Sequence, residues 1–107
     1  MTLNKIAEQS YRDAVRRQRN GGNVDTNTVS MLKHTATEVI EATEAYAYWL
    51  NASGTLKEEA SKGIFAGELA DIICCVAIIA GSNNIDLNKA VADCLEKNQK
   101  RAKGTGD

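Results

Sequence analysis

Residues 67–80 read GELADIICCVAIIA. Apolar residues occupy nearly every side of a helix built from this segment, which is typical of a helix that other helices cover on several sides. Two acids interrupt it: Glu68 and Asp71 stand three positions apart and therefore share one side of the helix. A carboxylate pair on such a side is costly unless a cation neutralises it. We therefore expect a buried helix over about residues 64–80 that contributes two ligands to a metal site.

The rest of the chain fits one small all-α domain over residues 1–107. Proline is absent, and Ala, Glu, Lys and Leu, which favour helix, are plentiful. Three further helices are expected, over about residues 3–20, 28–50 and 87–100. Nothing in the pattern indicates strands, so we expect an all-α helical bundle.

Capping residues mark where the expected helices begin. Thr2 and Asp86 are candidate N-caps for the first and last helices. The segment Thr55–Glu58 has the form of a capping box, which begins either a short helix or the third long one. We expect mobile ends at residues 1–2 and 102–107.

Charge and cysteine usage limit the partners and the compartment. The net charge of −1 implies no bulk attraction to a nucleic acid polymer or to a membrane. The sequence shows no basic segment followed by a hydrophobic run, so we expect no secretory signal. The longest apolar run, residues 72–80, is too short to span a bilayer. The three cysteines are an odd number, so we expect buried thiols in a reducing compartment and a cytoplasmic location.

The second helix has two unlike arcs. Its apolar arc consists of Val29, Leu32, Ala36, Val39, Thr43, Ala47 and Leu50. The opposite arc carries Glu38 and Glu41, which repeat the spacing of Glu68 and Asp71. On their own, Glu38 and Glu41 look like a solvated helix face. For Glu68 and Asp71, the alternative to a metal site is an exposed notch in an oligomer surface.

Four carboxylates in two such pairs predict a site for a hard cation. An acid-only ligand set selects Mg²⁺, with Mn²⁺ as the alternative, over zinc or copper. A di-iron bundle needs Glu-x-x-His on two helices, and the one histidine, His34, is in no such motif. No glycine-rich phosphate loop is present, so metal and side chains must handle any phosphate.

Five other residues are candidates for contacts with a ligand. His34, one turn before the first acidic pair, contacts either a phosphate or water near the site, or is a plain surface or packing residue. Asn98 lies on an apolar stripe and needs a partner, either a ligand or a helix terminus. Lys97 and Arg101 beside it complement either the helix dipole or phosphate oxygens. Tyr48 either stacks on a base or packs in an interface.

The order of these motifs is similar to that of a known family. Glu38-x-x-Glu41 is followed, after 26 residues, by Glu68-x-x-Asp71. This resembles the ExxE…ExxD signature of MazG-like nucleotide pyrophosphohydrolases, in the all-α NTP pyrophosphatase superfamily. Segments that resemble its third helix and its last helix are GELADII at 67–73, NIDL at 84–87 and EKNQKR at 96–101. The resemblance covers about residues 32–103.

The resemblance implies hydrolysis of a nucleoside triphosphate between the α and β phosphates by a metal-activated water. The implied Mg²⁺ ligands are Glu38, Glu41, Glu68 and Asp71. Glu41 is our candidate for the group that orients or deprotonates the water. The implied substrate contacts are at Asn98, Lys97, Arg101 and Tyr48.

Two departures from the family pattern stand beside this resemblance. Thr37 occupies the place of a further Glu in many members, and Cys94 the place of a Lys in some, so the number of metal ions and the phosphate contacts stay open. Family members assemble from short helical protomers, which implies a homodimer or homotetramer. The alternative function is a non-catalytic oligomeric module with an interaction or regulatory role, in which the third helix is only an oligomer seam.

Overall fold

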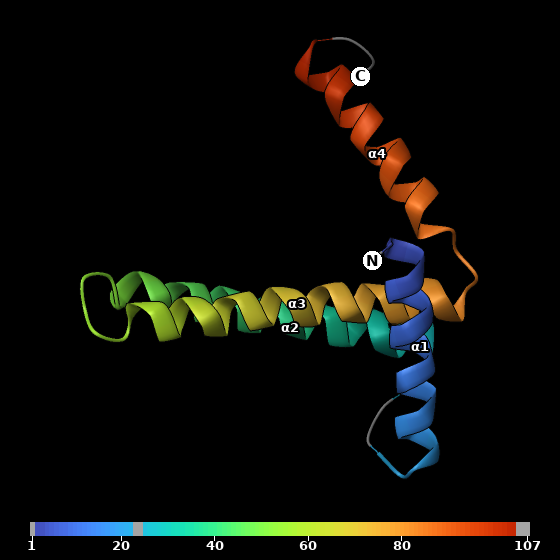
Figure 1. The fold of residues 1–107 in the computed structure, drawn as a ribbon, viewed down its shortest axis with the longest axis horizontal. Coiled ribbons are helices and arrows are strands. Elements are labelled where there is room, and N and C mark those ends of the chain that lie inside the picture. The colour runs from blue at the N-terminus through green and yellow to red at the C-terminus, as the bar shows by residue number, and fades with distance from the viewer. Residues whose placement is uncertain (1, 23–24, 105–107) are drawn as a thin grey trace.

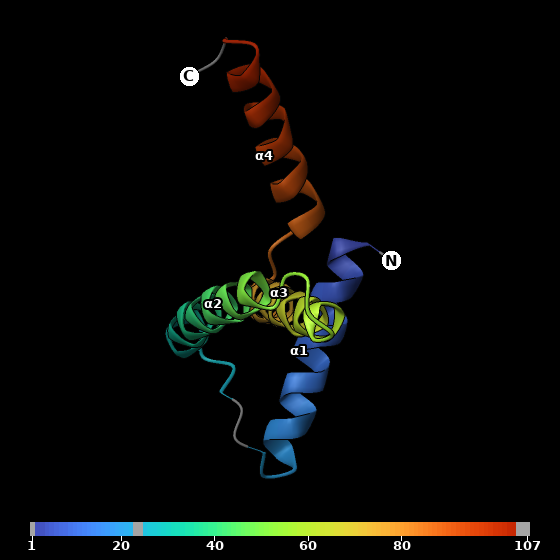
Figure 2. The ribbon, with the colours of Figure 1, turned by 90° about the vertical axis from the view of Figure 1, so that its left-hand side faces the viewer.

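The structure is a computed structural model that describes residues 2–22 and 25–104. Its helices are α1 (Leu3–Arg19), α2 (Thr28–Asn51), α3 (Glu58–Ser82) and α4 (Leu87–Ala102), and no strand occurs among the described residues. α2 and α3 lie side by side as a hairpin, and α1 crosses them near the end of α3 (Figure 1). α4 extends away from the hairpin in both views (Figure 2). The predicted all-α class with four helices is confirmed.

Caps begin α1 and α4 where the sequence predicts them. The side chains of Thr2 and Asp86 each accept a hydrogen bond from the backbone N–H three residues on, at 3.2 and 3.1 Å. Thr2 and Ala102, which we placed in mobile ends, are the N-cap of α1 and the last residue of α4. Residues 1 and 105–107 lie outside the described residues, so mobility of the ends stays a prediction.

α3 begins at Glu58, earlier than the sequence predicts, and runs on as one long helix. The expected capping box does not form, because the N-cap is Lys57, whose side chain makes no capping bond. The hydroxyl of Thr55 instead donates to the carbonyl of Ala52 at 2.6 Å. The side chain of Glu58 accepts from the backbone N–H of Gly54 at 3.3 Å, which ties the hairpin turn to the start of α3.

Small residues allow α1 to lie close against α3. A Cβ atom on Gly81 would lie 2.7 Å from the carbonyl oxygen of Ala7 and 2.6 Å from Cβ of Tyr11, so this position accepts only glycine. Around the crossing lies a small core made of Ala7, Ala14, Met31, Cys75, Ala77, Ile78 and Ala80. The core therefore sits at one end of the hairpin, where three helices meet.

Most large apolar side chains stay exposed in the protomer. On α2 the apolar arc faces solvent, with Val29 59% and Leu32 55% exposed. The opposite, acidic arc packs against α3, where Glu38 and Ala42 are buried. α3 and α4 also present exposed apolar residues, namely Ile64, Leu69, Ile73, Val76 and Leu95. Amphipathicity alone would have placed the other arc of α2 in the seam between the two helices.

Among the described residues, α3 is the one helix that is long and apolar enough to cross a membrane. The apolar run at residues 72–80 is short, but the whole helix has the length and the apolar composition of a membrane span. Of its most apolar stretch, 22% is buried. The core helix of a soluble protein can have the same length and apolar composition. Glu68 and Asp71 lie within α3, and ionised carboxylates at the centre of a bilayer are costly.

Candidate metal centre

Carboxylates from α2 and α3 meet in the seam of the hairpin. Glu38 and Glu41 share one side of α2, because they stand three residues apart. This side of α2 faces α3. Glu68 meets them from α3, and one oxygen of each carboxylate lies within 4.8 Å of the other two. The structure thus brings together three of the predicted ligands from two distant segments of the chain.

Two of these carboxylates have an oxygen that water does not reach. Glu38 is only 9% exposed. Oε2 of Glu38 and Oε2 of Glu68 are buried and have no hydrogen-bond partner among the described residues. A buried carboxylate oxygen without a partner is costly. A cation between the three acids would offset the repulsion between their charges.

His34 contacts the most buried of these acids. Its Nε2 lies 3.1 Å from Oε1 of Glu38, one turn along α2. Burial raises the pKa of Glu38, the charge of Glu41 raises it further, and His34 opposes this with a smaller effect. His34 therefore offsets only part of the rise in the pKa of Glu38. The structure places its ring beside Glu38, and a contact with phosphate stays a prediction.

Asp71 borders the cluster without joining it. Its side chain is exposed, and its oxygens are not in the group that lies within 4.8 Å. It lines, together with Glu38, a hollow of about 590 Å³ beside the cluster. Its charge also contributes to the raised pKa of Glu38. Its role as a fourth ligand stays a prediction.

The same hollow contains residues that the sequence did not single out. These are Arg17, Asp25, Ser30, Met31, Cys74, Cys75 and Ile78. Arg17 belongs to a run of arginines at the end of α1, which resembles an ordinary solvated face. No local pattern separates Arg17 from its neighbours, because its place beside the acids depends on how α1 crosses α3.

The cysteines are free, and only one of them is buried. Cys75 lies under the hollow, where burial raises the pKa of its thiol and the nearby charge of Glu38 raises it further. Cys74 and Cys94 are exposed, so the prediction that all the thiols are buried is wrong for these two in the protomer. A thiol with a raised pKa stays protonated and is a poor metal ligand.

The predicted substrate residues of α4 lie away from the cluster. Asn98, Lys97 and Arg101 are exposed on α4, which packs on α1 and points away from the hairpin (Figure 1). The amide of Asn98 donates to the sulfur of Cys94 at 3.8 Å, within its own helix. Tyr48 is 57% exposed. A single protomer therefore does not bring all the predicted substrate residues to the acids.

The aromatic residues after the first acidic pair form a cluster between α2 and α3. The ring of Phe65 lies 5.3 Å from that of Tyr46 and 5.9 Å from that of Trp49, measured between centroids. Nζ of Lys62 lies 5.9 Å from the centroid of the Trp49 ring. These contacts hold the hairpin together one turn before Glu68 on α3, and they leave Tyr48 outside the cluster.

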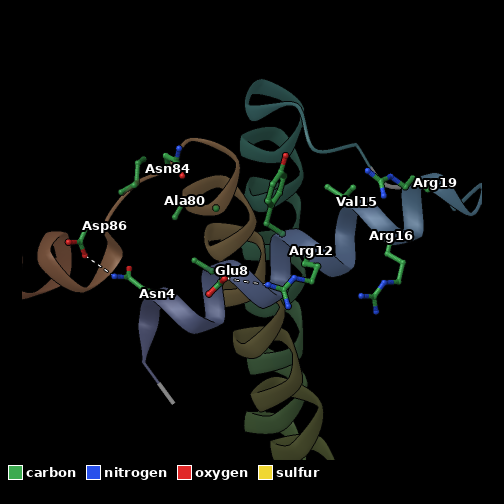
Figure 3. Close-up of a pocket in the computed structure, with 13 residues that line it drawn as sticks. Asn4, Glu8, Arg12, Val15, Arg16, Arg19, Ala80, Asn84 and Asp86 are labelled. Carbon is green, nitrogen blue, oxygen red and sulfur yellow. Dashed lines mark hydrogen bonds and ion pairs between the residues drawn. The ribbon is translucent and has the colours of Figure 1, made fainter.

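A second hollow, of about 900 Å³, lies between α1 and the α3–α4 connection (Figure 3). None of the predicted site residues lines it. Its polar groups contact one another, since Arg12 pairs with Glu8 at 3.3 Å and Asn4 donates to Asp86 at 2.9 Å. It is therefore separate from the acidic cluster in both position and chemistry.

No protein-family model, curated protein or solved structure matches the chain. The MazG-like resemblance thus rests on the motifs alone and stays a prediction. What the geometry shows is a group of three converging carboxylates, two of which have a buried oxygen without a partner among the described residues. Oxygen ligands of this kind are the ones that hard divalent cations prefer.

Proposed function

We propose that the protein is a Mg²⁺-dependent nucleoside triphosphate pyrophosphohydrolase of the MazG-like class. It hydrolyses an NTP or dNTP to the monophosphate and pyrophosphate. The observation that carries this proposal is the cluster of Glu38, Glu41 and Glu68, in which two buried oxygens have no partner among the described residues. The motif order described above supplies the reaction class.

The donor set supports a hard cation. The converging atoms are carboxylate oxygens, which suit Mg²⁺ and Mn²⁺. His34 contacts Glu38 instead of joining the converging oxygens, and the thiol of Cys75 has a raised pKa. When bound there, the ion would lower the pKa of a water and screen the charge of the phosphates.

The acids of the cluster have different surroundings, which suggests different roles. Glu38 and Glu68 have buried oxygens and would hold the ion. Glu41 is exposed to solvent and would orient the attacking water or accept its proton. His34 holds Oε1 of Glu38 and thereby sets the direction of its other oxygen.

A second copy of the chain would complete the substrate site. α4 has no buried residue, and the apolar faces of α2 and α3 are exposed in the protomer. Burial of such faces drives association, which favours a homodimer or homotetramer. Asn98, Lys97 and Arg101 would then contact substrate at the acids of another protomer.

Product analysis tests this function. The protein is incubated with each NTP and dNTP in the presence of Mg²⁺, and the products are separated by anion-exchange chromatography. We expect monophosphate and pyrophosphate, with activity lost in Glu68→Gln and kept in Glu59→Gln, an exposed acid on the same helix. Folded protein that turns over none of these nucleotides, or that releases orthophosphate instead, contradicts the proposal.

The exposed apolar faces of α2 and α3 also favour a second candidate, a non-catalytic oligomeric interaction module. Thermal unfolding with and without Mg²⁺ and nucleotide separates the two, because a ligand that binds only the native state raises its stability. A flat response favours the interaction module. The enzymatic function, which uses nucleoside triphosphates, implies the cytoplasm as the location.

A further inference from the structure

A positively charged arginine side chain lines the hollow beside the acidic cluster. Arg17, in the last turn of α1, lines this space of about 590 Å³ together with Glu38 and Asp71. The guanidinium forms no ion pair with any described residue, so it is not within 4.0 Å of either acid. The hollow thus separates a positive group from two negative ones.

Other charged groups near Arg17 are already engaged. On α1, Arg12 pairs with Glu8 at 3.3 Å and Arg16 approaches Asp13 at 3.9 Å. Neither of these arginines lines this hollow, whereas Arg17 does and is in none of the ion pairs among the described residues.

The third acid of the hollow, Asp25, is satisfied by its own loop. Its carboxylate accepts a hydrogen bond from the backbone N–H of Asn27 at 2.9 Å. This bond lowers the pKa of Asp25, and a hydrogen bond with the side chain of Ser30 lowers it further. Asp25 is therefore held by neighbours other than Arg17, which remains available to an anion.

The backbone fixes the point from which Arg17 enters the hollow. The N–H of Gly22 donates to the carbonyl of Arg17 at 2.8 Å, so the chain folds back onto this residue. A Cβ on Gly22 would lie 2.8 Å from that carbonyl oxygen, and Gly21 has a φ of +80°. Two glycines thus allow the tight turn that follows the end of α1 at Arg19.

We propose that Arg17 binds phosphate oxygens of the triphosphate substrate, across the hollow from the carboxylate cluster. This assignment deepens the function proposed above and rests on it. A guanidinium presents forked N–H donors that match the oxygens of a phosphate, and it stays charged at any working pH. A polyphosphate between the two walls would meet positive charge from Arg17 on one side and from a cation on the acids on the other.

Calorimetric titration of the full chain with inorganic pyrophosphate, at saturating Mg²⁺, tests the assignment without turnover. We expect Arg17→Gln to raise the Kd by about 10- to 100-fold, as for loss of a charged hydrogen bond. Arg17→Lys should lie between, because it keeps the charge and loses the fork. The matched control is Arg16→Gln, which should bind pyrophosphate like the wild type, because Arg16 lines the second hollow, of about 900 Å³, and not this one.

The titration and the turnover assay fail in distinguishable ways. Wild-type protein that binds no pyrophosphate, or an equal loss in the Arg16 and Arg17 variants, overturns the assignment. Turnover of a nucleotide with an unchanged KM in Arg17→Gln overturns it too, while the pyrophosphohydrolase proposal stands. Pyrophosphate binding that depends on Arg17, in a protein that turns over no nucleotide, supports a phosphate contact at Arg17 but overturns the enzymatic function, and with it the claim that the phosphate belongs to a substrate.

Discussion

Replacing Glu38 by glutamine should stabilise the metal-free protein and remove its stabilisation by Mg²⁺. Glu38 is 9% exposed, its Oε2 has no hydrogen-bond partner among the described residues, and oxygens of Glu41 and Glu68 lie within 4.8 Å of one of its oxygens. Glutamine keeps the size of the side chain and removes one negative charge from this crowded place. Its amide can also donate to the buried oxygen of Glu68.

The expected size of the effect follows from the surroundings of Glu38. Leaving a buried polar group unpaired costs about 1–3 kcal/mol, and weakening the 3.1 Å contact with His34 offsets part of the gain. A net gain of about 1–2 kcal/mol remains. For a domain of about 100 residues, each kcal/mol raises the melting temperature by about 4–8 °C. In the wild type, Mg²⁺ at about 100 times its Kd should add about 2.7 kcal/mol.

Thermal unfolding followed by circular dichroism, with and without Mg²⁺, measures both effects. Glu44→Gln is the control, because Glu44 is exposed on the same helix and should change neither quantity. A Glu38→Gln protein that melts below the wild type without Mg²⁺ refutes the reasoning about burial. One that keeps the full Mg²⁺ response removes Glu38 from the metal site.

Three further predictions concern pH, α4 and assembly. Burial raises the pKa of Glu38 above that of a glutamate in the unfolded chain, so at pH values between the two the native state binds this proton more readily than the unfolded chain does. The contribution of Glu38 to stability therefore falls as pH rises through this range. The urea midpoint of the metal-free protein should drop over the same range, and Glu38→Gln should show no such drop. Asn4→Ala removes the acceptor of the Leu87 N–H, bonded at 2.7 Å, and should lower the local stability of the start of α4 by about 1–2 kcal/mol, seen as faster hydrogen exchange at that amide. Val39→Lys charges a side chain that is 48% exposed, so light scattering should find a smaller assembly with unchanged helix content; an unchanged mass would exclude this face from the interface.

Local signals in the sequence predicted the helices well. Thr2 and Asp86 are caps whose partners lie within three residues, so they depend on no distant contact. The expected bounds of about residues 64–80 began α3 too late, although the motif at Thr55–Glu58 had left open a start there. The side chains of that motif bond within the hairpin turn instead of forming a capping box. N-cap residues thus predict where a helix begins, but the same side chains can instead form hydrogen bonds within a turn.

The face of α2 in the hairpin seam could not be predicted from periodicity. Amphipathicity identifies an apolar arc, but in the protomer that arc is exposed and Glu38 lies in the seam. The physical reason we propose is that the apolar arc is reserved for a second copy of the chain. A sequence pattern indicates that a face is buried, not whether its own chain or another covers it.

The candidate site was predicted in part, for a similar reason. Spacing predicted that Glu38 and Glu41 share one side of α2, but it did not predict that this side faces Glu68 on α3. Arg17 depends on the crossing of α1 over α3, and Asn98 on the direction of α4. Neither of these is encoded in a local pattern.

The most direct measurement is an anomalous difference map from a crystal of the full chain soaked in Mn²⁺. The proposed metal centre predicts a strong peak within coordination distance of Glu38, Glu41 and Glu68. A map without a peak there, with the acids turned apart into solvent, would contradict the claim that these carboxylates bind a divalent cation.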